Sequence, residues 1–483
     1  MKTLREIIKN CIPLKVYGSQ DKMISGMHFD SRKIQNDFVF FAIKGTLTDG
    51  HEYINQAIEK GATAIICENV PDQLNKDISY IQVENSAETF GICSSEYYDN
   101  PSRKIKLIGV TGTNGKTTVA TVLFHLIRKM GRKAGLISTI KYMIDDEEFE
   151  ASHTTPDQLF LNQFMAKMVQ RGCEYGFMEV SSHAIAQHRI NGLHFTGGIF
   201  TNITHEHIDY HGAFKEYVSV KKRFFDKLTP SSFAIINADD KNGHVMVQNS
   251  RSRVHFYALR KVSEYKAKII ESIFEGTLVK IENNEVWLKF IGEFNVYNLL
   301  AVYGCALNLG FGKKEVLRTL SLINPVKGRF EHFKIFDDKT VIIDYAHTPD
   351  ALKNILLSIN KLKNKSQKII TAVGAGGERD KEKRPVMGKI SVQYSNKVVF
   401  TSDNPRFEDE TNIIADLVSE IDKKDAGKFL VIQDRRQAIK TAIMLANRGD
   451  IILLAGKGHE LYQEIKGKKI PFDERKIVEE LLN

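Results

Sequence analysis

Cysteine is scarce in this chain, and long apolar runs are missing. The 483 residues include five cysteines, which lie far apart and form no C-x-x-C pair. Neither a disulfide framework nor a cysteine zinc site is therefore indicated, and reduced thiols are the simple expectation. No segment approaches 18 uninterrupted apolar residues, so no membrane insertion is expected. The first residues are charged and no signal-type apolar run follows them, which favours a cytoplasmic protein.

The chain also lacks a dense block of lysine and arginine, although it is basic. It has 68 Lys and Arg against 59 Asp and Glu, a net charge of +9. This surplus is dispersed, so it suits anionic ligands without predicting nucleic-acid or membrane binding. The length and the 42% hydrophobic content indicate a globular protein of about two to four domains.

The most informative stretch runs from Lys106 to Thr118. An apolar strand over 107–110 leads into a glycine-rich turn, and a helix is expected from Thr117 onward. In this arrangement backbone N–H groups face a phosphate, the lysine adds a charge and a threonine hydroxyl can reach Mg²⁺. The strict phosphate-loop pattern has glycine where this chain has Val110, so a chance turn remains an alternative. The loop predicts ATP binding by Gly112, Thr113, Asn114, Gly115, Lys116, Thr117 and Thr118.

Strands and helices alternate along the rest of the chain, which predicts an α/β fold of three domains. A turn-rich stretch at 98–102 and a linker at 325–330 separate them. We expect a small N-terminal α/β substrate domain (1–101), a central P-loop ATPase with a mostly parallel sheet (102–326) and a C-terminal Rossmann-like domain (327–483). Strands are expected at 38–43, 62–67, 80–83, 134–138, 175–180, 198–201, 233–237, 340–344, 368–373, 397–401, 428–432 and 450–455. Residues 254–291 are expected to form a β-rich insertion.

Polar side chains follow several of these strands. Glu179 ends an apolar strand in the sheet of the phosphate loop, where a hard oxygen ligand could hold Mg²⁺. The loop 201–212 carries His205, His207 and His211, which could suggest zinc, but their spacing is a weak zinc signature and a solvated loop is the simpler alternative. Lys221 lies on an amphipathic helix, and its periodicity alone gives it no special role.

Four polar loops follow strands in the third domain, at 344–350, 374–379, 403–406 and 455–460. Ligands of doubly wound sheets bind at the carboxyl ends of the strands. Each loop alone would be an ordinary turn, but together they predict a ligand cleft.

The ordered set of motifs closely resembles the Mur ligases, the ATP-dependent amide-forming enzymes of peptidoglycan precursor synthesis. The resemblance covers essentially the whole chain and rests on the motifs at 111–118, 179–183, 201–212, 292–298, 328–331 and 344–350. It implies a UDP-substrate domain, a central ATPase and a Rossmann-like domain, in agreement with the boundaries above.

Within the family the chain is similar to the ligase that extends UDP-N-acetylmuramoyl-L-alanyl-D-glutamate. The matching motifs are Asp30-Ser-Arg32 and His153-Thr-Thr-Pro-Asp157, the second of which usually begins with asparagine. The resemblance assigns UDP-substrate binding to Ser31, Thr154, Thr155, Ser181, Gln187 and Arg189.

Asp403-Asn-Pro-Arg406 resembles the motif of the enzymes that add meso-diaminopimelate. Arg406 can pair with the distal carboxylate of this amino acid, with help from Arg379, and Glu460 can accept from its distal ammonium. L-Lysine lacks that carboxylate and should be rejected. The implied diaminopimelate-binding residues are Arg379, Asp403, Asn404, Pro405, Arg406, Gly456 and Glu460.

The resemblance also implies an acyl-phosphate mechanism with two Mg²⁺ ions. One ion would be held by Thr117 and Glu179, and the other would lie near Glu179, His207 and Lys221. Lys221 would carry a CO₂-derived carbamate, which requires a neutral amine. Lys116, Lys221, His207 and Arg329 are the expected catalytic residues. Asn298, Arg329, Asp344 and His347 match nucleotide-contacting positions, and ATP is expected to favour domain closure.

Three alternatives remain at this stage. An L-lysine-adding ligase of the same family would differ at Arg406, and a folylpolyglutamate synthetase would share the ATPase core. A catalytically silent nucleotide-binding protein is disfavoured by the intact Lys116, Glu179, His207 and Lys221. We expect a monomer without a nucleic-acid partner.

Overall fold

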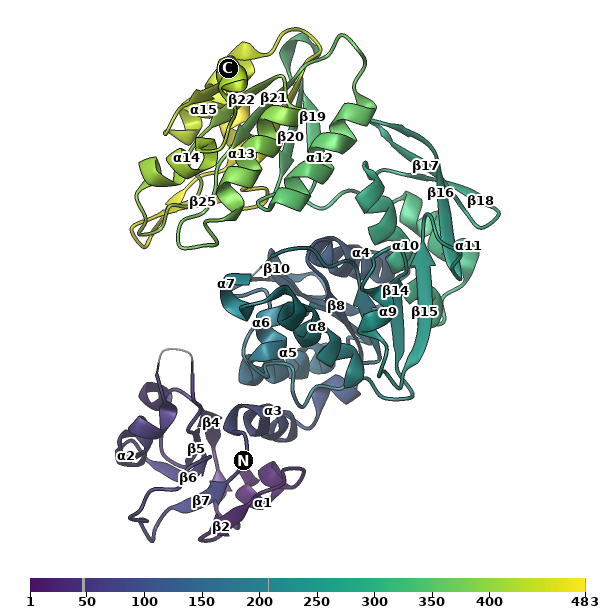
Figure 1. Ribbon diagram of the computed structural model, residues 1–483. Coiled ribbons are helices and arrows are strands. Elements are labelled where there is room, and N and C mark those ends of the chain that lie inside the picture. Colours follow the sequence, from purple (N-terminus) through teal and green to yellow (C-terminus); the bar gives the residue numbers. More distant parts are fainter. Residues whose placement is uncertain (46–47, 207, 483) are drawn as a thin grey trace.

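The computed structural model describes residues 1–45, 48–206 and 208–482. It contains three α/β units in chain order, each built on its own main sheet, with the N-terminal unit and the C-terminal unit at opposite ends of the molecule (Figure 1). The expected fold class is confirmed. The boundaries expected at 101/102 and 326/327 fall between these sheets and remain predictions. Among the described residues, no helix is both long enough and apolar enough to cross a membrane.

Short apolar runs form the N-terminal sheet, which has the order β2-β7-β6-β5-β4 and one antiparallel edge, β2. The three strands expected here form within two residues of the predicted bounds. The elements are β1 (Lys2–Thr3), α1 (Leu4–Ile8), β2 (Lys15–Tyr17), β3 (Met23–Ile24), β4 (Gly26–His28), β5 (Phe38–Phe41), α2 (Ile54–Glu59), β6 (Ala62–Cys67), β7 (Ser79–Gln82) and α3 (Ser86–Tyr97).

The central sheet has the order β11-β10-β9-β12-β8-β13-β14-β15-β16-β17-β18 and is parallel from β9 to β16. Its strands are β8 (Lys106–Thr111), β9 (Ala134–Ile137), β10 (Lys141–Ile144), β11 (Glu147–Glu150), β12 (Tyr175–Glu179), β13 (Gly197–Phe200), β14 (Phe233–Asn237), β15 (Arg253–Ala258), β16 (Tyr265–Ile273), β17 (Gly276–Ile281) and β18 (Asn284–Leu288). Its helices are α4 (Lys116–Lys129), α5 (Gln158–Gln170), α6 (Ser182–Ala186), α7 (Ile208–His211), α8 (Phe214–Asp226), α9 (Gly243–Met246), α10 (Glu293–Asn308) and α11 (Lys313–Ser321).

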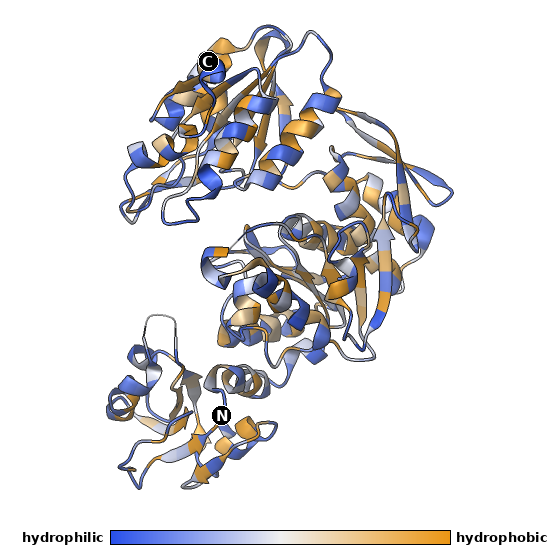
Figure 2. Cartoon of the chain, in the orientation of Figure 1, coloured by the Kyte–Doolittle hydropathy of each residue, from blue (hydrophilic) through white to orange (hydrophobic). Residues whose placement is uncertain are grey.

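Both faces of the central sheet are covered, because its strands are apolar on both sides. Ile108 and Ile235 pack with α4, α10 and α11, whereas Leu107 and Ile236 pack with α5, α6 and α8. Neighbouring residues of a strand point to opposite faces, so one apolar run supplies two cores. The orange strands enclosed by mixed-colour helices in Figure 2 show this pattern.

Residues 254–291 are β-rich as expected, but they extend the central sheet rather than forming an insertion. Strand β15 pairs in parallel with β14. Within this stretch, β16 pairs in parallel with β15, and the pairs β16-β17 and β17-β18 are antiparallel. The sequence shows the strands, while the pairing partner of β15 is a tertiary feature, and β15 also contacts α10.

The C-terminal sheet has the order β19-β20-β24-β21-β22-β23 and is parallel apart from β19. The elements are β19 (Glu331–Lys334), β20 (Thr340–Asp344), α12 (Pro349–Leu362), β21 (Ile369–Val373), α13 (Lys383–Tyr394), β22 (Lys397–Phe400), α14 (Glu410–Val418), β23 (Phe429–Val431), α15 (Arg435–Leu445), β24 (Ile451–Ala455), β25 (Tyr462–Ile465), β26 (Lys468–Pro471) and α16 (Glu474–Leu482). Helices α12, α13 and α14 cover one face, and α15 and α16 cover the other.

A buried ion pair joins the last two helices to the sheet. Arg435 of α15 lies 2.8 Å from Glu474 of α16, and both side chains are about 1% exposed. The same guanidinium donates to the carbonyl oxygens of Ser402 and Ala455, at the ends of β22 and β24. The ion pair therefore links α15 and α16 to the points where the loops after β22 and β24 begin.

We expect Glu474→Gln to lower the free energy of unfolding of the C-terminal unit by about 3–5 kcal/mol, because it leaves a buried guanidinium uncompensated. Thermal melting would measure the loss. The control is Glu480→Gln on the same helix, whose pair with Arg436 is solvent-exposed and should be worth about 0–1 kcal/mol. Equal melting temperatures for the two variants would contradict the prediction.

Candidate active site

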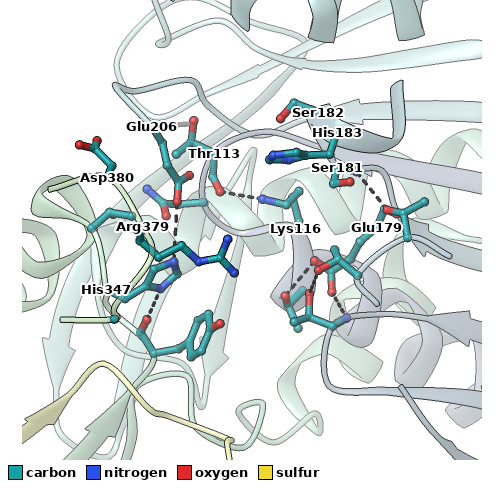
Figure 3. Close-up of a pocket in the computed structure, with 18 of the residues that line it drawn as sticks. Thr113, Lys116, Glu179, Ser181, Ser182, His183, Glu206, His347, Arg379 and Asp380 are labelled. Atoms are coloured by element: carbon teal, nitrogen blue, oxygen red, sulfur yellow. Dashed lines mark hydrogen bonds and ion pairs between the residues drawn. The ribbon is translucent and has the colours of Figure 1, made fainter. Parts of the chain in front are cut away.

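A cavity of about 460 Å³ lies between the central and the C-terminal units. The phosphate loop and the ends of β9, β12 and β13 line it from one side, and the four loops of the C-terminal sheet line it from the other. Figure 3 shows Lys116, Glu206, His347 and Arg379 around one space, with Glu179 and Ser181 beside it. The four loops predicted to share one edge of the C-terminal sheet do meet in this cavity.

The phosphate loop connects β8 to the first turn of α4. Gly115 has φ +88°, and a Cβ atom there would lie 2.4 Å from Oδ1 of Asn298, so both its conformation and its surroundings require glycine. Lys116 Nζ donates to the carbonyl oxygens of Gly112 and Thr113, at 2.9 and 2.7 Å. Val110 is still inside β8 and fully buried. Its departure from the strict pattern therefore falls in the strand rather than in the turn.

Thr117 and Glu179 form a compact oxygen pair at the loop. The Thr117 hydroxyl donates to Glu179 Oε2 at 3.0 Å, and Oε1 accepts from the Thr139 N–H at 2.7 Å. Within the described part of the chain, no three His, Cys, Asp or Glu side chains gather in a way that could hold a metal. Mg²⁺ is commonly held by one or two carboxylates together with substrate phosphates, so a hydroxyl and a single carboxylate beside a phosphate loop fit that ion.

Lys221 is buried beneath the phosphate loop. Its Nζ donates to the carbonyl of Gly112 at 3.0 Å and lies 4.8 Å from the centre of the Tyr217 ring. Burial, and then the nearby Lys116, lower the pKa of this amine well below its usual range. The amphipathic pattern alone would place a lysine of α8 in solvent, so this burial is a tertiary feature.

Three contacts join the C-terminal unit to the phosphate loop and its neighbours. Arg329 Nη2 donates to the Thr117 hydroxyl at 3.2 Å, while its guanidinium lies 4.4 Å from the centre of the Tyr345 ring. Asn114 Nδ2 donates to Asp350 Oδ2 at 3.1 Å. His347 Nε2 and Glu206 Oε1 are 3.7 Å apart. The cavity is thus built from two units that touch at the nucleotide loop.

The predicted nucleotide residues divide into two groups. Arg329, His347 and the loop residues from Thr113 to Thr118 line the cavity. Asn298 instead lies behind Gly115, and Asp344 accepts from the N–H groups of Phe330 and Ala346, both at 2.7 Å. Neither of these two, nor Gly112, is among the lining residues. Asn298 and Asp344 therefore support the loops that face the cavity.

Most of the predicted UDP-substrate residues lie together. Arg189 donates to the Thr155 carbonyl at 2.9 Å and to Gln187 Oε1 at 2.6 Å. Thr154, Thr155, Ser181, Gln187 and Arg189 all line the cavity. Ser31 does not, since it is buried in the N-terminal unit and donates to Gln56 Oε1 at 2.6 Å.

The predicted diaminopimelate residues come from three loops that bond to one another. Arg406 Nη1 donates to the Gly377 carbonyl at 2.6 Å, and its Nε lies 3.4 Å from Glu464 Oε2. Asn404 Nδ2 donates to Glu460 Oε2 at 2.8 Å. The lining residues from these loops are Arg379, Asp403, Asn404, Arg406, Gly456 and Glu460, whereas Pro405 does not line the cavity.

Two of the three histidines that could have suggested zinc, His205 and His211, are described, and each contacts a residue other than a histidine of this loop. His205 stacks on Phe214, and His211 Nε2 lies 3.0 Å from the Ser182 hydroxyl. His207, predicted as a catalytic and metal residue, lies outside the described residues.

Several residues that line the cavity were not predicted from the sequence. Glu206 stood in a loop noticed for its histidines, and Lys383 follows Arg379 in a charged run that would ordinarily be solvated. Lys383 Nζ in fact donates to the His347 carbonyl at 3.1 Å. Tyr345 was part of a quoted motif, but its stacking with Arg329 depends on tertiary packing.

Three family models match successive parts of the chain. They are the Mur ligase family, catalytic domain at 23–98, the Mur ligase middle domain at 110–306, and the Mur ligase, glutamate ligase domain at 328–458. The middle-domain match includes the phosphate loop, and the glutamate-ligase-domain match covers most of the Rossmann-like unit that faces it. The chain belongs to the Mur ligase family of ATP-dependent ligases.

Individual relatives are more specific. The chain is 52% identical over 480 residues to the UDP-N-acetylmuramoyl-L-alanyl-D-glutamate–2,6-diaminopimelate ligase of Parabacteroides distasonis, and 50% identical to that of Bacteroides fragilis, with 99% of each chain covered. A solved structure of a ligase with the same name has a TM-score of 0.71 at 28% identity and covers 100% of this chain and 98% of its own.

Gly115→Ala should weaken nucleotide binding at least about tenfold, because about 1–3 kcal/mol of overpacking against Asn298 adds to the backbone strain. Titration with a fluorescent ATP analogue would measure it. The control is Gly131→Ala, since Gly131 has φ +75° but nothing within 4 Å of the added Cβ. Equal weakening in both variants would mean that the Asn298 contact is unimportant.

Proposed function

We propose that this protein joins 2,6-diaminopimelate to the D-glutamate carboxylate of UDP-N-acetylmuramoyl-L-alanyl-D-glutamate at the expense of ATP. The observation that carries the proposal is that one cavity contains the phosphate loop, the Arg189 cluster and the Arg379–Arg406–Glu460 loops. Three substrates held there would have their reacting groups in one place. Relatives about 50% identical over nearly the whole chain are named for this reaction.

In this scheme the amino acid binds to the C-terminal loops. Arg406 and Arg379 would meet the distal carboxylate, and Glu460 would accept from the distal ammonium. We propose the meso stereoisomer because the Asp403–Arg406 motif resembles that of the enzymes that add meso-diaminopimelate. L-Lysine has no distal carboxylate, so it would leave the arginines of this site unpaired. We therefore expect the site to reject L-lysine.

The chemistry is carboxylate activation followed by amide formation. The D-glutamate carboxylate attacks the γ-phosphorus of ATP, so ADP leaves and an acyl phosphate forms. The amine of diaminopimelate then attacks the acyl carbon, loses a proton, and inorganic phosphate leaves. Lys116 and Arg329 would offset the anionic charge that accumulates when two anions approach. Both cations line the cavity near the loop.

Two cofactor assignments belong to the same proposal. Thr117 and Glu179 would hold one Mg²⁺, and a second would lie near Glu179, His207 and the Lys221 carbamate. Bound Mg²⁺ would supply charge neutralisation at the phosphates. Lys221 is suited to carbamate formation, because its buried amine has a lowered pKa and a neutral amine is the form that adds CO₂.

The reaction needs no partner chain, since both walls of the cavity come from one polypeptide. We therefore propose a monomer with no nucleic-acid partner. We also propose a cytoplasmic location, in keeping with its proposed substrates and ATP.

The function is tested by phosphate release with ATP, the UDP-dipeptide and either amino acid. We expect turnover with meso-diaminopimelate and a preference over L-lysine of about 10⁴ in kcat/KM. Arg406→Ala should raise KM for diaminopimelate and shrink that preference. Arg448→Ala, whose side chain is 81% exposed, is the matched control and should change neither quantity. Preferential use of lysine by the unmodified protein would overturn the proposal.

Carbamate formation on Lys221 is tested with ¹³C-bicarbonate. A carbamate carbon resonance should form in the unmodified protein and be absent in Lys221→Met, which should also lose at least about 100-fold in turnover. The next residue offers the control, because Lys222 pairs with Asp226 at 2.7 Å and Lys222→Met should retain the resonance. A signal that survives in Lys221→Met would place the carbamate elsewhere.

A further inference from the structure

Lys457 lies in the loop that follows β24 and is completely buried, with 0% of its side chain exposed. Burying an ammonium is unfavourable unless hydrogen-bond acceptors and carboxylates replace its water. A lysine in a Gly-Lys-Gly loop would ordinarily lie in solvent. The residues around it must therefore compensate its charge.

In the described part of the chain, the ammonium of Lys457 has three side-chain hydrogen-bond partners, and each belongs to the proposed amino-acid site. Its Nζ is 3.0 Å from Asn404 Oδ1, 3.2 Å from Glu460 Oε2 and 3.3 Å from Asp403 Oδ1. Asp403 and Asn404 follow β22, whereas Glu460 follows β24. The ammonium thus joins two of the loops that line the cavity.

These contacts determine how Asn404 and Glu460 are oriented. Asn404 Oδ1 accepts from Lys457 and from the N–H of Glu464 at 2.9 Å, so its NH₂ must point the other way. That NH₂ donates to Glu460 Oε2 at 2.8 Å, the same oxygen that accepts from Lys457. Among the described residues, Oε1 of Glu460 has only a long contact, 3.5 Å, with the Tyr345 hydroxyl. The network occupies one oxygen and leaves the other for a donor in the cavity.

The charges around Lys457 favour a cationic ligand group. Asp403 and Glu460 face Lys457, and Glu474 faces Arg435 behind them. When all are ionised, these five side chains carry three negative and two positive charges, and Lys383, which also lines the cavity, interacts electrostatically with Asp403. An ammonium from a ligand would balance the excess negative charge of the five.

We propose that Lys457 is a positioning residue that selects for the second ammonium of the amino-acid substrate, by holding Glu460 Oε2 and Asn404 so that Glu460 Oε1 faces that ammonium. This inference rests on the proposed function. It concerns a residue that would not itself touch the substrate.

The test compares meso-diaminopimelate with L-2-aminopimelate, which keeps the reacting amine and both carboxylates but lacks the second ammonium. The unmodified protein should prefer diaminopimelate by about 100-fold in kcat/KM, as expected for a buried charged hydrogen bond. Lys457→Met should reduce the preference to within about threefold, since the ammonium no longer meets an oriented carboxylate. The KM for ATP should stay within about twofold, because the phosphate loop is untouched.

Two further variants separate positioning from structural support. Lys457→Arg keeps the charge and should retain part of the preference. Lys339→Met removes a lysine that is also buried in the C-terminal unit but donates to the Ile443 carbonyl, outside the cavity, and should leave the preference unchanged. The preference is a ratio within one preparation, so a partly unfolded sample does not alter it. If Lys457→Met does not fold, Lys457→Gln gives the same comparison.

An unchanged preference in a folded Lys457→Met or Lys457→Gln variant would overturn the proposal, as would an unmodified protein that does not discriminate between the two amino acids. Absence of turnover with diaminopimelate in the unmodified protein would instead refute the proposed function.

Discussion

The chain of contacts from Arg329 through Thr117 to Glu179 is the interaction on which the site depends. It runs from the start of the C-terminal unit to the phosphate loop and then to the end of the neighbouring strand β12. Because both sheets present the carboxyl ends of their parallel strands to the same space, one hydroxyl can connect a guanidinium to a buried carboxylate. Together with the Asn114–Asp350 and His347–Glu206 contacts, this link joins the two walls of the cavity beside the loop where phosphate is expected.

Several cationic side chains are buried in this molecule, and their surroundings differ. Arg435 is neutralised by Glu474 and ties helices to strand ends. Among its described contacts, Lys221 has only carbonyl and hydroxyl oxygens within hydrogen-bonding distance, and burial, followed by the nearby Lys116, lowers the pKa of its amine. Lys457 is surrounded by carboxylates and an amide. The same residue type is thus suited to becoming an anion in one place and to orienting anions in another.

The central and C-terminal units contribute different groups to the cavity. The central unit contributes the phosphate loop and the polar strand ends, and the C-terminal unit contributes the loops that we assign to the amino acid. None of the described residues of the N-terminal unit lines the cavity, and Ser31 lies within that unit. Under the proposed function, the UDP-linked substrate would reach from that unit to the cavity, which suits the order of the three units along the molecule (Figure 1).

Much of the architecture could be predicted from the sequence by itself, because its signals are local. Apolar runs such as 62–67 and 451–455 form strands that are buried on both faces, and the glycine turn before Lys116 can be recognised from a few residues. The polar loops after β20, β21, β22 and β24 could also be predicted to converge, since parallel strands end at one edge.

Only the tertiary structure decided which of these residues face the cavity and which lie behind it. Asn298 and Asp344 lie behind the loops, β15 continues the central sheet, and Lys221 and Lys457 are buried although their local patterns would place them in solvent. Burial and pairing depend on segments far apart in the chain, as when residue 457 meets residue 403. No local period or motif contains that information, because the free energy of a buried charge depends on whatever surrounds it in space.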